Sequence, residues 1–212
     1  MKEKIVFQSS PTDSDIILQR NESVRIFRVI LPSVNPEQYT LKVELRGDYS
    51  CIEVNTIYIV PSSHQVNISD QITVYGACAE AHLNTIGIID NDGEKQLSQI
   101  IDFQRGAKNS IGSETEEVLM LGKNVVNITT PIIRCNESEV VASHSVSAGE
   151  IDEEALWNLQ TLGLSRQAAL REIIQSKLKK IIKTIPETTE RRLLTKRLQG
   201  IINNISELNH EN

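Results

Sequence analysis

The sequence is poor in aromatic residues and cysteines. Aromatic side chains make up 4% of the 212 residues, so the core must be built from Ile, Val and Leu rather than from rings around a ligand pocket. The three cysteines, Cys51, Cys78 and Cys135, are irregularly spaced, which argues against a disulfide framework and against a metal site made only of cysteines.

Long apolar runs are also missing. The sequence has no stretch of about eighteen apolar residues, the length needed to span a membrane. The segment MKEKIVFQSS lacks the apolar part of a signal peptide. We therefore expect a cytoplasmic protein that does not enter the membrane. The net charge of −6, from 22 basic and 28 acidic residues, argues against a nucleic-acid partner, because phosphate binders usually present a basic surface.

The sequence motifs of common enzyme classes are absent as well. There is no GxxxxGKS/T phosphate loop, no GxGxxG, no HExxH and no GxSxG. His64 and His210 are interpreted as solvent residues, and His82 lies four residues after Cys78, a spacing that pairs ligands on a helix but not on a strand. The acidic pair Glu116–Glu117 is interpreted as surface carboxylates. We therefore expect a protein that is not an enzyme.

Short β-rich runs separated by turn residues fill residues 23–133, as in CIEVNTIYIV between RGDYS and PSSHQ. Several alternate by twos, which is typical of strands with one buried face. No helical rhythm is long enough for a crossover, which argues against βαβ units. A sandwich, a barrel and a β-solenoid all remain open. The shortage of aromatics and of two-residue hairpin turns favours a solenoid, although no hexapeptide repeat is present.

The rhythm becomes helical after Gly149. Asp152 is a good N-cap with Glu153 in the first turn, Gly163 is placed to end this helix, and Ser165 is placed to cap the next one. Two further helices carry long Ile and Leu stripes, which must be covered by each other or by another chain. We divide the chain into an N-terminal arm or leading strand (1–22), a β core (23–149) and a C-terminal helical domain (150–212).

Positive charge is concentrated in this helical part. Residues 171–199 hold nine Lys or Arg and three acidic residues, a net of +6, so the remainder of the chain carries −12. Two interpretations are open, namely a solvated helix face and a docking surface for an acidic partner.

His144 ends the β-rich run EVVASH and is followed by small residues up to the helix cap. Small neighbours leave an imidazole accessible, and neutral imidazole is a common ligand for iron and zinc. The alternative is a hydrogen-bonded histidine that closes the end of a strand.

The segment VVASHSVSAGEIDEEALWNLQTLGLSRQAALREII resembles the C-terminal signature of the SufB/SufD family, the scaffold components of the SUF iron–sulfur cluster assembly machinery. SufD-like members read ASHGATVGxIDEEALFYLxSRGxxxxxAxxxI here, in step from Ala142 to Ala168. Upstream, GAKNSIGSETEEVLMLGKN is similar to the family stretch GAQxTDAxQxNRNLLLSD. The resemblance covers residues 100–185.

The resemblance implies a mainly β fold, a right-handed parallel β-helix (β-solenoid) core with a C-terminal α-helical domain. Members pair through their last strands, and their C-terminal helices dock SufC, an ABC-type ATPase. The chain is about half the usual family length, which implies a reduced member with fewer solenoid turns.

Site residues follow from the same alignment. His144 corresponds to the family histidine at the pair interface, where the nascent cluster forms. Glu116 corresponds to the cluster-site cysteine of SufB, and Ser145 to a SufB glutamate that is usually glycine in SufD, so the resemblance favours a SufD-like role. Cys135, one strand before His144, is a candidate substitute ligand. The implied docking surface comprises Asp152, Glu153, Leu156, Leu159, Gly163, Ile173, Ile174, Lys179 and Lys180.

We therefore expect a SufD-like subunit that pairs with a SufB-like scaffold and docks a SufC-type ATPase. A transient iron–sulfur cluster would be shared at the pair interface, and no nucleotide would bind to this chain directly. Two alternatives remain open. One is a self-sufficient homodimeric scaffold that uses His144, Cys135 or Glu116 of both chains. The other is a β-solenoid interaction protein that has lost the cluster role.

Overall fold

The computed structural model describes residues 2–8, 14–32 and 36–208. The described strands are β1 (Lys2–Gln8), β2 (Ser14–Leu18), β3 (Glu22–Ile30), β4 (Glu37–Leu45), β5 (Cys51–Val60), β6 (Gln65–Val74), β7 (Glu80–Ile89), β8 (Glu94–Phe103), β9 (Ser110–Met120), β10 (Val126–Cys135) and β11 (Val140–Glu150). The helices are α1 (Glu153–Thr161), α2 (Arg166–Ile182) and α3 (Thr189–Leu208).

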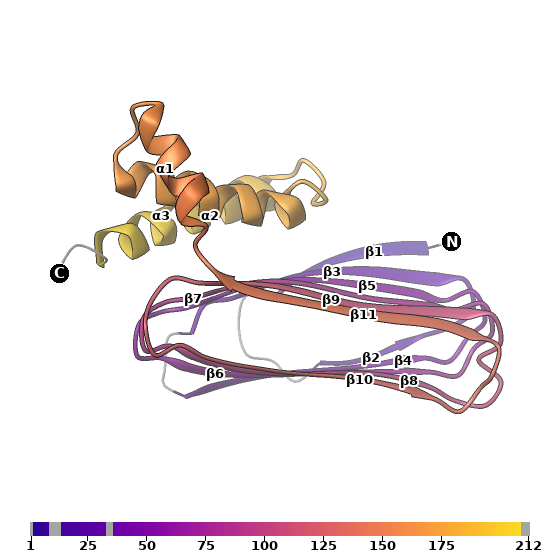
Figure 1. Ribbon diagram of the computed structural model, residues 1–212. Helices are drawn as coiled ribbons and strands as arrows, with labels where there is room; N and C mark the ends of the chain where they lie inside the picture. The colour runs from indigo at the N-terminus through magenta and orange to yellow at the C-terminus, as the bar shows by residue number, and fades with distance from the viewer. Residues whose placement is uncertain (1, 9–13, 33–35, 209–212) are drawn as a thin grey trace.

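The strands form two parallel sheets that face each other (Figure 1). The first sheet has the order β1-β3-β5-β7-β9-β11, and the second has the order β10-β8-β6-β4-β2. Consecutive strands therefore alternate between the sheets, and each odd–even pair makes one turn of a solenoid. The prediction of a mainly β solenoid with a C-terminal helical domain is confirmed. Within the segment predicted as an arm or leading strand, β1 pairs with β3 and β2 with β4.

Each solenoid turn is about thirty residues long, because Cys51 pairs with Glu80 and Ser110 pairs with Val140. Residues in the left-handed conformation stack at the corners between strands. Cys78 (φ 54°) is one of them, and its N–H donates to the carbonyl of Lys108 on the next turn at 2.8 Å. The repeat is thus a backbone geometry that different residue types fill, which explains why no short sequence repeat is visible.

Alternation along the strands fills the inside of the solenoid. In β6, every second residue from Val66 to Val74 is buried. Pro131 lies in the middle of β10. A proline is tolerated there because β10 is an edge strand of its sheet.

The helical domain covers the outer face of the odd-numbered sheet (Figure 1). One apolar cluster joins both sides. Its members are Phe27, Val29, Ile57, Ile59, Ile86, Ile88, Leu119 and Leu121 of the sheet and Leu156, Ala169, Leu170, Ile174, Leu178, Ile181, Ile185, Leu198, Ile202 and Ile205 of the helical part. The Ile and Leu stripes are therefore covered by each other and by this sheet. At about 0.8 kcal/mol per buried methylene, this cluster firmly attaches the helices to the solenoid.

The predicted helix boundaries are confirmed at three residues. The Asp152 carboxylate accepts from the N–H groups of Glu154 at 3.0 Å and Ala155 at 3.2 Å. Ser165 accepts from the N–H of Ala168 at 3.2 Å, and Gly163 has a φ of +95°, which favours glycine. No helix in the described part of the chain is long and apolar enough to cross a membrane.

Candidate functional site

The solenoid ends at two unpaired edges, β10 in one sheet and β11 in the other. Apolar side chains remain exposed on both strands, namely Val126, Ile128, Val141 and Val146, at 38%, 48%, 68% and 44% of their surface. Exposed strand edges with apolar side chains are surfaces to which another chain readily adds. We call these two strands the open end.

His144 lies in the middle of this open end. It is exposed, and it pairs in parallel register with Glu114 on β9. Ala142, two residues before His144, packs against the interior apolar cluster. Because residues two apart share a face of a strand, His144 belongs to the interior face of β11.

Glu114 is buried directly beside His144, with 2% of its surface exposed. Both of its carboxylate oxygens lack a hydrogen-bond partner. Burial, and to a lesser degree the negative charge of Asp70, raise the pKa of Glu114 to about 8. In the three preceding turns the same column holds Ile26, Val54 and Leu83, so a carboxylate replaces an apolar residue only here.

A polar layer inside the solenoid lies next to Glu114. Arg28 donates to both oxygens of Asp70, at 2.8 Å and 2.6 Å, and Gln99 donates to Asp70 and to Thr85 at 3.3 Å each. The bidentate geometry of Arg28 and Asp70 is the strong form of such a pair. The interior arginine is therefore fully engaged by Asp70 and by the Thr56 hydroxyl, to which it donates at 3.1 Å and 3.2 Å.

Glu116 belongs to a second buried network. Its carboxylate accepts from Lys95 Nζ and the Tyr58 hydroxyl at 2.8 Å each, and from the Thr129 hydroxyl at 2.6 Å. Glu116 is 3% exposed, so its interpretation as a surface carboxylate is wrong. It shares the interior face of β9 with Glu114, and its register partner on β11 is Val146.

The three predicted iron or cluster ligands lie in different surroundings. Cys135 is exposed at the end of β10 and pairs with Phe103, His144 is exposed on β11, and Glu116 is buried. Within the described ranges, no three His, Cys, Asp or Glu side chains form a group that could hold a metal ion.

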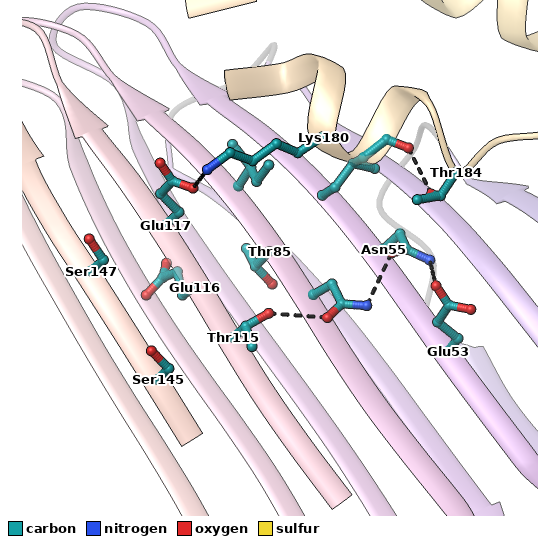
Figure 2. A pocket seen from close by; sticks show the side chains of 13 residues that line it. Glu53, Asn55, Thr85, Thr115, Glu116, Glu117, Ser145, Ser147, Lys180 and Thr184 are labelled. Atoms are coloured by element: carbon teal, nitrogen blue, oxygen red, sulfur yellow. Dashed lines mark hydrogen bonds and ion pairs between the residues drawn. The ribbon is translucent and has the colours of Figure 1, made fainter. Parts of the chain in front are cut away.

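A groove of about 540 Å³ runs across the outer face of the odd-numbered sheet beside α2 (Figure 2). A chain of hydrogen bonds crosses its floor, from Asn55 to Glu53 at 2.9 Å, from Asn84 to Asn55 at 3.2 Å and from Thr115 to Asn84 at 3.1 Å. Ser145 lies on β11, next to Thr115 in register. The groove therefore reaches the open end on the side opposite His144.

Glu117 joins α2 to the solenoid at the rim of this groove, where it meets Lys180 (Figure 2). Lys177 and Lys180 donate to its two carboxylate oxygens, and these hydrogen bonds lower the pKa of Glu117. Lys180, which was predicted as a docking residue, thus contacts the chain's own β9. Lys179, its neighbour, has an exposed side chain.

The other predicted docking residues divide by burial. Leu156 and Ile174 are buried in the cluster between helices and sheet, with 1% and 0% of their surface exposed, and Leu159 and Ile173 pack against that cluster. The exposed members are the helix-end residues Asp152, Glu153 and Gly163. The two carboxylates serve locally as well, because Asp152 caps α1 and Glu153 binds Arg166 at 2.9–3.0 Å.

Two exposed apolar residues in and just after α1 were not predicted as site residues. Trp157, the single tryptophan of the chain, is 64% exposed on α1, and Leu162, just after α1, is 77% exposed. Large exposed apolar side chains mark contact surfaces, and tryptophan is enriched at binding hot spots. The sequence could have indicated them, because they do not lie on the apolar helix face formed by Leu156 and Leu159.

Part of the chain is similar to two known proteins. The chain is 24% identical over 142 residues to the "Iron-sulfur cluster assembly protein SufD" of Bacillus subtilis (strain 168), and 24% identical over 139 residues to the protein of the same name from Escherichia coli (strain K12). These alignments cover 67% and 65% of this chain but 32% of each relative. The chain thus matches about a third of the length of these relatives.

A family comparison covers more of the chain. Residues 13–177 match the family described as "SUF system FeS cluster assembly, SufBD core domain". The match runs from β2 into α2, so it includes the whole open end and His144. The chain therefore belongs to the SufBD core family of the SUF iron–sulfur cluster assembly system.

Proposed function

We propose that this chain is a non-catalytic, SufD-like scaffold subunit that pairs with a SufB-like protein and docks a SufC-type ATPase. Family membership supports a role in SUF iron–sulfur cluster assembly. Pairing, ATPase docking and the absence of catalysis are proposals for this chain, which matches about a third of each relative.

The open end carries the pairing proposal. Both sheets stop at an unpaired strand, and apolar residues such as Val141 and Val146 stay exposed there. A partner with an equivalent end could continue both sheets, satisfy the free backbone groups of β10 and β11, and cover these side chains.

His144 gives this interface its chemistry. Its imidazole would lie between the two chains and would serve, when neutral, as a terminal ligand for iron or for a nascent cluster. The cluster is cargo in this proposal and is passed on. Because this chain lacks a complete group of ligands within its described residues, the partner must supply the others.

The helical domain is the proposed docking surface for the ATPase. The buried Leu156 and Ile174 fix the helices on the solenoid, which leaves Trp157 and Leu162 exposed as apolar anchors. Since the helices rest on the sheet that ends in β11, a movement of the ATPase could reach the pair interface through this packing.

The test is size-exclusion chromatography with light scattering on the chain alone, with a SufB-like protein, and with both partner types, after anaerobic addition of iron and sulfide. The proposal expects a complex with the partners and cluster absorbance only in that complex. A coloured self-dimer would show that the chain is a self-sufficient scaffold. A complex whose cluster is unaffected by His144→Ala would show an interaction protein without a cluster role.

A further inference from the structure

Glu114 is a buried carboxylate without a partner. Among the buried carboxylates of the described residues, it is the one with both oxygens unpartnered, whereas one oxygen of the buried Asp90 accepts the N–H of Asn91 at 2.8 Å. Buried carboxylates are normally paired with cations, hydrogen-bonded or bound to metal ions. Glu114 therefore indicates a missing partner.

The nearby interior cations cannot fill this role, because they are already paired. Arg28 binds Asp70 with both of its terminal nitrogens, and Lys95 binds Glu116 at 2.8 Å with both side chains almost fully buried. A cation for Glu114 must therefore come from outside. The open end offers a route, because there the exposed His144 is the register partner of Glu114 on the last described strand.

We propose that Glu114 and His144 together bind one divalent transition-metal ion. This inference rests on the proposed function, in which ferrous iron would be the cargo. Neighbouring strands lie about 4.8 Å apart, so two side chains on one face at the same register can share an ion. Imidazole with carboxylate is a ligand pair that suits ferrous iron. Water or the pairing partner supplies the remaining ligands. In this site the Glu114 carboxylate turns toward β11.

The preceding solenoid turns support a functional reason for Glu114. Ile26, Val54 and Leu83 occupy its column, so apolar residues satisfy the stacking of these turns and a carboxylate is not needed for it. A buried, unpartnered carboxylate destabilises the fold, and such local conflicts with folding are typical of functional sites.

The inference is tested with Co²⁺ alone, which has visible ligand-field bands and the charge of ferrous iron. Co²⁺ is titrated under anaerobic conditions into the full chain and into its complex with a SufB-like protein. One Co²⁺ per chain is expected, and both Glu114→Leu and His144→Ala should raise Kd at least tenfold. Leucine fits the column of Glu114, so this variant is expected to fold, as circular dichroism and thermal melting will verify.

Asp90→Asn is the matched control, because Asp90 is also buried, also has an unpartnered oxygen, and lies seven residues beyond the register partner of Glu114 on β7. It should bind Co²⁺ like the wild type. The inference is overturned if Glu114→Leu and Glu114→Gln both bind Co²⁺ with wild-type affinity. It is also overturned if the wild type binds no Co²⁺ in either sample. Light scattering without metal measures pairing separately. If the wild type pairs but binds no Co²⁺, only this inference is contradicted. If the wild type binds Co²⁺ but does not pair, the proposed function is contradicted.

Discussion

Lys95 and Glu116 form an ion pair inside the solenoid, with Nζ and Oε1 2.8 Å apart and 0% and 1% of their side chains exposed. This pair occupies the position at which the resemblance places the cluster-site cysteine of SufB. The Tyr58 and Thr129 hydroxyls donate to the same carboxylate. Glu116 is thus part of the core of the solenoid, where a charge is tolerated only because each partner is present.

We predict that removing either charge destabilises the fold more than removing both. Lys95→Met or Glu116→Leu alone leaves an uncompensated buried charge and should lower the free energy of unfolding by about 3–5 kcal/mol. The double variant should recover most of this loss. Urea unfolding of the four proteins measures the coupling, and strictly additive losses would contradict the prediction.

We predict that Glu114 makes stability fall as pH rises. Its pKa of about 8 in the folded chain lies above its ordinary value of 4.5, so the folded state holds a proton that the unfolded state releases. The stabilisation is complete below pH 4.5 and is lost as pH approaches and passes 8.

The matching measurement is urea unfolding of wild type and Glu114→Gln at pH 5 and pH 9, with a chelator present. The free energy of unfolding should fall between pH 5 and pH 9, and this fall should be larger in the wild type by on the order of 2–4 kcal/mol. Equal pH dependence in the two proteins would refute the prediction.

The sequence predicted the features that depend on local signals. The caps at Asp152 and Ser165 and the end at Gly163 are set by nearby backbone groups, and the turn residues between short apolar runs predicted short strands. The shortage of aromatics and of hairpin turns favoured a solenoid among the possible β folds, and the family resemblance implied it. The sequence did not predict that the helical stripes rest on a sheet. Asn55 to Val60 are buried without alternation, and continuous burial identifies a strand covered on both faces.

The candidate site was predicted in part. His144 was identified from its small neighbours and from the resemblance, and the structure puts it at the open end. Glu114 was missed, because SETEEV looks like an exposed polar segment. Two-residue alternation along the strand could have identified it, because Glu114 and Glu116 lie on the same face as Gly112 and Val118, which are buried. Two glutamates on a core-facing column require partners that only the fold reveals.

We predict that two adjacent lysines respond differently to charge reversal. Lys180→Glu removes one of the two lysine contacts of α2 with Glu117 and places a second negative charge beside it, whereas Lys179→Glu changes only an exposed side chain. Lys180→Glu should therefore lower the free energy of unfolding by about 1 kcal/mol, and Lys179→Glu should leave it unchanged.

The same variants test the docking surface of the ATPase. If the basic face of α2 binds the ATPase, Lys179→Glu should weaken that binding severalfold at moderate salt while stability stays constant. Unchanged affinity, measured by calorimetry, would assign the positive charge of this helix to solvation and to the contact with Glu117.

We predict that Trp157→Ala weakens ATPase binding at least tenfold without changing the fold. Trp157 is 64% exposed and lies outside the buried cluster, so its loss should alter the unfolding temperature little, whereas an aromatic anchor in an interface is worth about 2 kcal/mol or more. Leu162→Ala should have a smaller effect in the same direction. Leu193→Ala on α3 is the matched control, because Leu193 is also 64% exposed. Equal losses from Trp157→Ala and Leu193→Ala would mean that binding follows general apolar exposure, and no loss from either would move the docking surface away from α1.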